Sequence, residues 1–139
     1  MRTVFADASY WIALANPRDE LHQKAIQVSA ALGQARLATS EMVLTECLNH
    51  LAGKGAHLRR AVVEIVNRIR EDPNTTVFPQ TSILFRETLA FYAERYDKAW
   101  SHTDCSSFLL MRKHGLNEAL TYDEHFQQAG YRALLREGS

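Results

Sequence analysis

Four acidic residues occupy positions from which their carboxylates could act together: Asp7, Glu46, Asp104 and Asp123. If such groups converge, each pair about 4 Å apart repels by roughly 1 kcal/mol in water and about 4 kcal/mol at an effective dielectric of 20. A divalent cation removes this repulsion, and ligation by oxygen alone favours Mg²⁺ or Mn²⁺ over zinc. Metal-bound water in such a site is suited to hydrolysing a phosphate ester.

Short apolar runs typical of strands alternate with longer helical patterns. The expected strands are "TVFAD" (3–7), "ARLATS" (35–40), "TTVFP" (75–79), "EALTYD" (118–123) and "YRALL" (131–135). The expected helices span about 9–15, 19–32, 40–51 and 58–70; another is marked by Phe85, Leu89, Tyr92 and Tyr96, and a last one begins near 103. Strands that alternate with helices predict an α/β fold with a parallel sheet flanked by helices.

The predicted topology brings the four acids to one edge of that sheet. In such folds the binding crevice forms at the carboxyl ends of the strands. At about 100° per residue, Asp104 is in register with Ser107, Phe108 and Met111, so it points toward the core. Leu44, Leu48 and Leu51 form an apolar seam on one face of the helix over 40–51. Glu46 lies nearly opposite this leucine seam and points away from it. We therefore expect the acids to reach the crevice from different elements.

Each acid also has an ordinary structural interpretation. Asp104 could be a first-turn aspartate that forms a box-like cap with Ser101, an arrangement worth roughly 0.3 to 1 kcal/mol. Asp7 could cap the helix that follows it, Asp123 could belong to a turn, and Glu46 could be a solvated helix residue. These interpretations explain the acids one at a time and leave their shared edge unexplained.

The other residue types with catalytic or ligand chemistry form no comparable pattern. The six histidines are scattered without paired metal spacing, so we expect surface or packing roles; His102 and His125 are nearest to the site acids in sequence. Cys47 and Cys105 are too few for a disulfide scaffold or a cysteine-rich zinc site, which predicts buried thiols in a reducing compartment. Four arginines in the helix over 58–70 are expected on a solvated face: Arg59, Arg60, Arg68 and Arg70.

Composition limits the function classes. The chain has 139 residues, 46% of them hydrophobic, which fits one domain over 1–139. Its 16 basic and 16 acidic residues balance, so a nucleic acid would have to be bound by a local arrangement of charge. No window reaches the roughly 18 apolar residues of a membrane span, and no signal-type segment opens the chain. We therefore expect a cytoplasmic protein without membrane attachment.

Four segments together resemble the PIN-domain family, specifically the VapC-type ribonuclease toxins of toxin–antitoxin pairs. They are "FADASYWIALANPRDELHQKA", "SEMVLTECLNHL", "WSHTDCSSF" and "ALTYDEHFQQAG", in the family's order over nearly the whole chain. The resemblance implies a three-layer α/β/α fold with a central parallel sheet of four to five strands.

The resemblance also implies a mechanism and partners. It makes Asp7, Glu46, Asp104 and Asp123 the catalytic and metal-binding acids for Mg²⁺ or Mn²⁺; the accessory polar residues would be Ser9 and Ser107. It further implies in-line hydrolysis of RNA with 5′-phosphate products, a cognate antitoxin whose C-terminal segment lies across the site, and a homodimer. Of the four acids, Asp123 is expected to be the least critical, since the fourth acid varies in such proteins.

Two other functions are compatible with parts of the pattern. An aspartyl-phosphate phosphatase also places an acid at the end of its first strand, but such enzymes carry a second acid two residues later, where this chain has Ser9. A PIN-like module that binds RNA or a protein without cutting is the alternative outside the enzymes. Absence of divalent-ion binding would favour that module.

Overall fold

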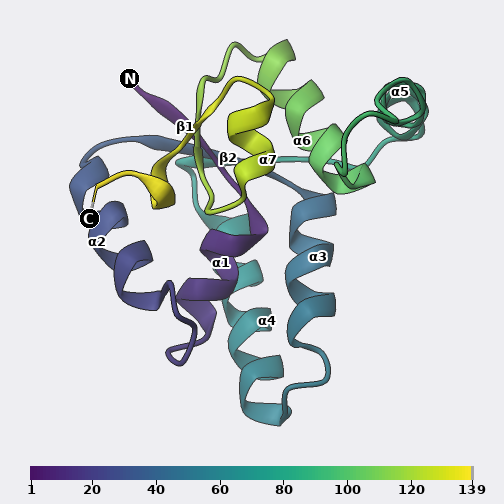
Figure 1. Cartoon of the computed structure of the whole chain (residues 1–139). Coiled ribbons are helices and arrows are strands. Elements are labelled where there is room, and N and C mark those ends of the chain that lie inside the picture. The colour runs from purple at the N-terminus through teal and green to yellow at the C-terminus, as the bar shows by residue number, and fades with distance from the viewer. Residues whose placement is uncertain (139) are drawn as a thin grey trace.

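The computed structural model describes residues 1–138 and consists of five strands and seven α-helices with a terminal 3₁₀ turn (Figure 1). In chain order the elements are β1 (Thr3–Ala6), α1 (Ala8–Ala15), α2 (His22–Leu32), β2 (Arg36–Ser40), α3 (Glu41–Leu51), α4 (Ala56–Glu71), β3 (Thr75–Phe78), α5 (Ser82–Glu94), α6 (His102–Lys113), β4 (Glu118–Leu120), α7 (Glu124–Gln128), β5 (Arg132–Ala133) and η1 (Leu134–Arg136). Within these described residues, no helix is long and apolar enough to cross a membrane.

The five strands form one sheet in the order β3-β2-β1-β4-β5, and every neighbouring pair is parallel. The predicted α/β fold with a flanked parallel sheet is therefore confirmed. From β1 the chain proceeds to β2 and β3 on one side and then crosses to β4 and β5 on the other. This reversal at β1 and β4 is the topological switch point, beside which open α/β sheets form their binding crevice.

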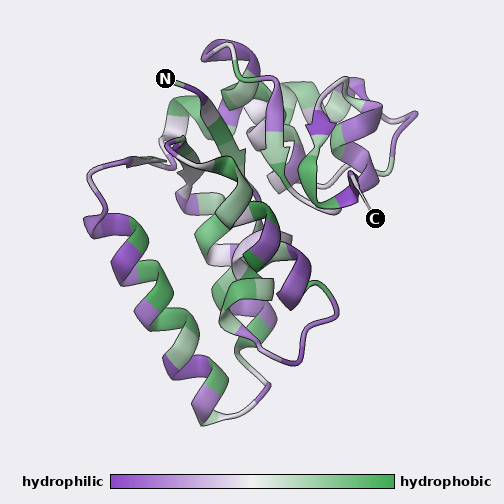
Figure 2. Cartoon of the chain, turned by 90° about the vertical axis from the view of Figure 1, so that its left-hand side faces the viewer, coloured by the Kyte–Doolittle hydropathy of each residue, from purple (hydrophilic) through white to green (hydrophobic). Residues whose placement is uncertain are grey.

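The helices pack in two groups. Helix α1 contacts α2, α3 and α4, whereas α6 contacts α5, α7 and α3. Figure 1 shows the α3–α4 pair extending away from the sheet and α5 standing out at one side. In Figure 2 the long helix α4 is banded in hydrophobic and hydrophilic colours, because one stripe faces the protein and the other faces water. The arginines expected on a solvated face, Arg59, Arg60, Arg68 and Arg70, are all exposed.

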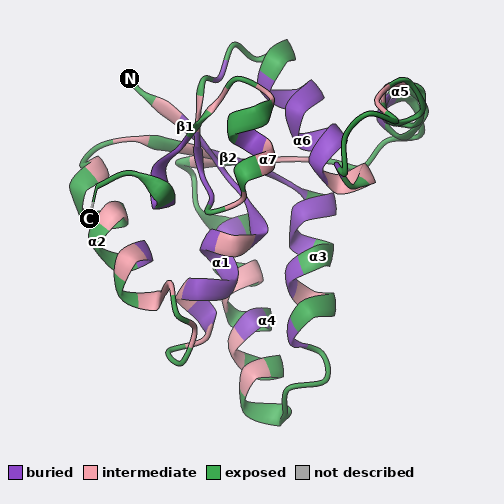
Figure 3. Ribbon diagram, in the orientation of Figure 1, coloured by how far each residue is buried: buried purple, intermediate pink, exposed green. Residues whose placement is uncertain are grey.

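The core is continuous from the central strands into α6, most of which appears buried in Figure 3, and it includes Phe126 of α7. The Phe108 ring meets the rings of Trp100 and Phe126 edge-on, each at a centroid distance of 4.9 Å. Trp100 also donates from Nε1 to Gln128 Oε1 at 2.9 Å. These contacts fix α6 against α7, which matters because both helices carry site residues at their N-termini.

Several predicted boundaries were wrong for local reasons. The helix expected from residue 19 begins at His22, because Asp19 forms a turn in which its Oδ1 accepts from the Leu21 N–H at 2.9 Å. The strand expected over 118–123 ends at Leu120, where the chain turns into α7. Tyr96 lies beyond α5, which ends at Glu94.

The apolar stripe that predicted α5 is not the side that this helix buries. Phe85, Leu89 and Tyr92 are exposed, and the adjacent stripe containing Leu84 and Thr88 is buried. Leu84 packs with a separate small cluster that includes Met42 of α3 and Leu110 of α6. Figure 3 accordingly shows α5 mostly in the colour of exposed residues.

Candidate active site

Asp7 lies at the carboxyl end of β1, beside the switch point, and is 6% exposed. It is the N-cap residue of α1, but its side chain makes no capping hydrogen bond. Instead, its Oδ2 accepts from the Thr121 hydroxyl at 2.8 Å. The capping interpretation is therefore wrong for this side chain, which is aimed across the sheet edge toward the end of β4.

Thr121 organises the loop between β4 and α7 and is fully buried. Its Oγ1 donates to Asp7, accepts from the Asp123 N–H at 3.0 Å, and lies 3.3 Å from Ser9 Oγ. Ser9 Oγ also accepts from the Tyr122 N–H at 3.1 Å. The predicted accessory residue Ser9 is thus beside Asp7, where it ties the first turn of α1 to the loop after β4.

Asp104 is held at the start of α6 by a reciprocal cap. Ser101 Oγ accepts from the Asp104 N–H at 3.0 Å, and Asp104 Oδ2 accepts from the Ser101 N–H at 3.1 Å. The capping interpretation is therefore confirmed, and it does not compete with a site role: Asp104 is buried on the same face as Phe108 and Met111. The cap and the packed face together fix the position of its carboxylate.

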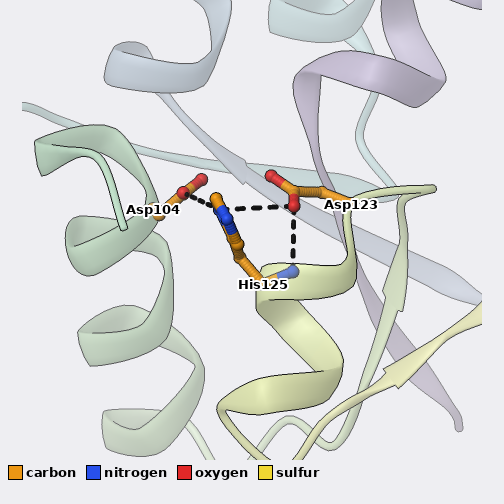
Figure 4. Close-up of side chains that lie close together, drawn as sticks. All are labelled: Asp104, Asp123 and His125. Atoms are coloured by element: carbon orange, nitrogen blue, oxygen red, sulfur yellow. Dashed lines mark hydrogen bonds and ion pairs between the residues drawn. The ribbon is translucent and has the colours of Figure 1, made fainter. Parts of the chain in front are cut away.

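His125 lies between two of the acids (Figure 4). Its Nδ1 is 2.9 Å from Asp104 Oδ2 and 3.3 Å from Asp123 Oδ1. Asp123 Oδ1 also caps α7 by accepting from the His125 N–H at 2.9 Å, which confirms the turn interpretation of this acid. Partial burial alone lowers the pKa of His125, but the hydrogen bond to Asp104 and the nearby negative charges outweigh it and raise that pKa.

Glu46 approaches the site from α3. Its neighbour Cys47 is buried, with Sγ 3.9 Å from the Ala8 carbonyl, so α3 packs against the first turn of α1 next to Asp7. Glu46 itself is exposed, as its position opposite the leucine seam predicts. Loss of hydration, followed by the charges of Asp104 and Asp123, raises the pKa of Glu46.

The four carboxylates lie within one another's electrostatic field. Burial raises the pKa of Asp7 to about 7, opposed by its hydrogen bonds and reinforced by the charges of Glu46 and Asp104. Among residues 1–138, no lysine or arginine comes within ion-pair distance of any of the four acids. His125 is the one basic side chain paired with them in this part of the chain. The cluster therefore has an excess of negative charge that a cation would offset.

The ligand chemistry of the cluster fits a divalent cation that prefers oxygen. Ligand atoms of Asp104, Asp123 and His125 lie within 4.8 Å of one another, close enough for a shared metal ion. Asp7 and Glu46 do not belong to it, although their charges reach it. Asp7 and Asp104 are buried acids with anionic neighbours, an arrangement that a bound divalent cation would stabilise.

The second predicted accessory residue, Ser107, lies one turn after Asp104 and is fully buried. Its hydroxyl has no hydrogen-bond partner in the described structure. It therefore takes no part in the network that holds the acids, in contrast to Ser9.

Two residues of the site escaped the sequence-based prediction. His125 was expected to be a surface or packing residue, which is wrong, because the packing of α6 against α7 places it between Asp104 and Asp123. Thr121 was included only as part of a strand. The available signal was the segment "TYDEH": Thr121 two residues before a site acid and His125 two residues after it. His102 does have the expected packing role, against the Phe85 ring at 4.9 Å.

Comparison with known proteins finds relatives that match nearly the whole chain. The chain is 29% identical over 131 residues to the 23S rRNA-specific endonuclease VapC20 of Mycobacterium tuberculosis, covering 92% of this chain and 95% of the relative. The crystal structure of VapC20, described as a toxin that cleaves the sarcin–ricin loop, matches with a TM-score of 0.81 over the same shares of the two chains. FitAcB from Neisseria gonorrhoeae shares the fold, with a TM-score of 0.59 at 14% identity and 94% coverage of both chains.

A model of the PIN domain matches residues 4–130, a span that runs from β1 through α7 and contains all four site acids. The resemblance inferred from the four sequence segments is confirmed by this match and by the similarity to VapC20. The chain belongs to the PIN-domain family.

Proposed function

We propose that this protein is a Mg²⁺- or Mn²⁺-dependent endoribonuclease and the toxin of a toxin–antitoxin pair. The observation that carries the proposal is the convergence of four carboxylates at the switch point without a lysine or arginine partner in the described residues. The endonuclease activity named for VapC20, a relative over nearly the full length of both chains, supports the same conclusion.

The four acids would contribute differently to binding a cation. Asp7 and Asp104 are the fixed ligands, since the first is oriented by Thr121 and the second by its cap with Ser101. Glu46 and Asp123 complete the anionic cluster from α3 and from the loop after β4. Bound there, the cation would lower the pKa of a coordinated water and stabilise charge on the phosphate as it is attacked.

His125 is placed to control charge in the absence of the cation. Its ring partly neutralises Asp104 and Asp123 when it is protonated, and its raised pKa favours that state. Asp7, Asp104 and Asp123 are each held by a hydrogen bond, from Thr121, Ser101 and His125 respectively, so these three carboxylates need little rearrangement to accept a ligand.

RNA is the proposed substrate, and the 23S rRNA named for the relative makes ribosomal RNA the first substrate to test. The proposed partners are a cognate antitoxin, which would cover the carboxylate cluster, and a second copy of the chain in a homodimer. A ribosomal substrate would place the activity in the cytoplasm.

The proposal is tested by incubating the purified protein with ribosomal, transfer and messenger RNA in Mg²⁺ or Mn²⁺, and mapping the new 5′ ends. We expect discrete cuts with 5′-phosphates that disappear with EDTA and in Asp104→Asn. Cutting that persists after chelation would contradict the metal-dependent mechanism. Binding of RNA without cutting, together with no calorimetric signal for either metal, would instead identify a non-catalytic PIN-like module.

A further inference from the structure

A second feature of the surface lies where α5 ends and the chain turns toward α6. A cavity of about 460 Å³ lies there, and its lining includes Tyr92, Arg95, Tyr96, Lys98, Trp100 and Ser101. We refer to it as the Tyr96 cavity. It contains no site acid, and none of the interactions that hold Asp7 or Asp123 depends on it.

The Tyr96 cavity adjoins the carboxylate cluster through one residue. Ser101 lines the cavity, and its backbone N–H and side chain are both hydrogen-bonded to Asp104. A polymer whose scissile phosphate lies at Asp104 can therefore extend into this cavity with a neighbouring nucleotide. The feature is thus located where a subsite for the substrate chain is needed.

The aromatic side chains of the cavity are unusually open. Tyr96 is 92% exposed and Tyr92 is 48% exposed, so neither side chain is buried in the core. Trp100, in contrast, is buried beneath the Arg95 guanidinium, whose Cζ lies 4.6 Å from the ring centroid. An exposed ring beside a fixed cation is the combination with which proteins bind unpaired nucleobases and their phosphates.

The charged residues around this cavity are of both signs: Arg95 and Lys98 stand beside the exposed acids Glu94 and Asp97. Lys98 is exposed and makes no ion pair within the described residues, whereas Arg95 is shared with Asp97. A second, smaller cavity of about 220 Å³ continues from Arg95 and Trp100 to Arg112, whose guanidinium lies over Phe91. Lys98 and Arg112 make no ion pair within the described residues, so they are the cations left on this surface for a phosphate backbone.

We infer that the Tyr96 cavity is a subsite for single-stranded RNA, in which the Tyr96 ring stacks on the base of a nucleotide next to the scissile phosphate and Lys98 binds a backbone phosphate. The inference rests on the proposed function and adds to it the residues that hold the substrate. It also requires the target to be unpaired at that nucleotide, as in a loop, since a paired base does not offer its face to a side chain.

The test is fluorescence anisotropy of a short labelled single-stranded RNA in EDTA, so that binding is measured without cutting. Tyr96→Ala is expected to raise Kd about 10-fold. Tyr96→Phe is expected to bind with the wild-type Kd, because stacking needs the ring and not the hydroxyl. Lys98→Ala is expected to make the slope of log K against log salt shallower by about 0.7, the value for one contact to a single strand. The matched control is Arg60→Ala, an exposed cation on α4, which should leave Kd and slope as in the wild type.

The outcomes separate this inference from the proposed function. Wild-type cleavage of RNA combined with unchanged binding in Tyr96→Ala and Lys98→Ala would overturn the subsite and leave the endoribonuclease standing. Weaker binding in both variants would support the subsite even if no cleavage were detected. A changed sedimentation coefficient in Tyr96→Ala with unaltered RNA binding would assign the surface to a protein contact and overturn the inference.

Discussion

The two halves of the carboxylate cluster are held in different ways. On the sheet side, Asp7 is buried among Thr121 and the ends of the strands, and its ionisation is opposed by that burial. On the helix side, Asp104 and Asp123 cap α6 and α7 and share His125 as a basic partner. On the helix side, Asp104 and Asp123 stabilise the helices that they cap. On the sheet side, burial disfavours the charged form of Asp7. A buried, uncompensated carboxylate is retained at the cost of stability, which indicates a functional role.

The largest effects are expected from replacing one acid of each half and measuring RNA cleavage and stability. Asp7→Asn and Asp104→Asn should each lower RNA cleavage about 1,000-fold or more, since a bound metal supplies several kcal/mol of transition-state stabilisation. Their effects on stability should differ in sign. Chemical denaturation of the metal-free protein at neutral pH should show Asp7→Asn stabilised, and Asp104→Asn destabilised by about 1 kcal/mol through its weakened cap. Equal destabilisation of both variants would contradict the contrast between the two halves.

The pH dependence of stability tests the sheet side alone. The pKa of Asp7 rises from an ordinary 3.8 to about 7 in the folded protein, so between these values the folded state binds the additional proton. The contribution of Asp7 to the unfolding free energy of the metal-free protein therefore falls as the pH rises from about 4 to 7. At about 1.4 kcal/mol per pKa unit, the loss reaches about 4 kcal/mol.

Urea denaturation at a series of pH values checks this expectation, with Asp7→Asn as the control. The difference in unfolding free energy between the variant and the wild type should be small near pH 4 and grow toward pH 7. A difference that stays constant with pH would show that burial does not perturb Asp7.

The contrast was only partly predictable from the sequence. Helical periodicity is local, so it correctly placed Asp104 on the buried face with Phe108 and placed Glu46 on the outside. The position of His125 depends on a contact between two helices, Phe108 against Phe126, which no local pattern encodes. The exposed stripe of α5 shows the same limit: apolar spacing predicted the helix, but its partners in α3 and α6 determined which side is buried.

The link between the halves is Thr121, which donates to Asp7 and accepts from the Asp123 backbone. Thr121→Val keeps the shape and removes both hydrogen bonds, so we expect a loss of about 1 to 3 kcal/mol in unfolding free energy. Metal affinity, measured by calorimetry, should fall about 10- to 100-fold, as for other residues that orient ligands. The control is Thr88→Val, a buried threonine in α5 that donates to the Leu84 carbonyl away from the site: metal affinity should stay at the wild-type value. Equal losses of metal affinity in both variants would contradict the claim that Thr121 positions Asp7 and Asp123.

The smallest expected effect concerns Ser9, which ties α1 to the loop after β4 through the Tyr122 N–H. Ser9→Ala should cost about 0.5 to 1.5 kcal/mol in thermal or chemical unfolding, the net value of an ordinary hydrogen bond. Ser107→Ala, which removes a buried hydroxyl without a partner in the described structure, should be neutral or stabilising. The reverse order of these two serines would show that the network around Ser9 is misassigned.

The most direct test of the account is calorimetric titration of Mn²⁺ into the metal-free protein near pH 6.5, in two buffers with different ionisation enthalpies. Wild-type protein should bind saturably and release protons, because the cation requires Asp7 in its charged form at a pH below its pKa of about 7. Asp7→Asn should bind more weakly and release fewer protons than the wild type; the release that remains comes from His125 and Glu46, whose pKa values are also raised. Binding of equal strength and equal proton release in wild type and Asp7→Asn would contradict the claim that the four acids form one cation site.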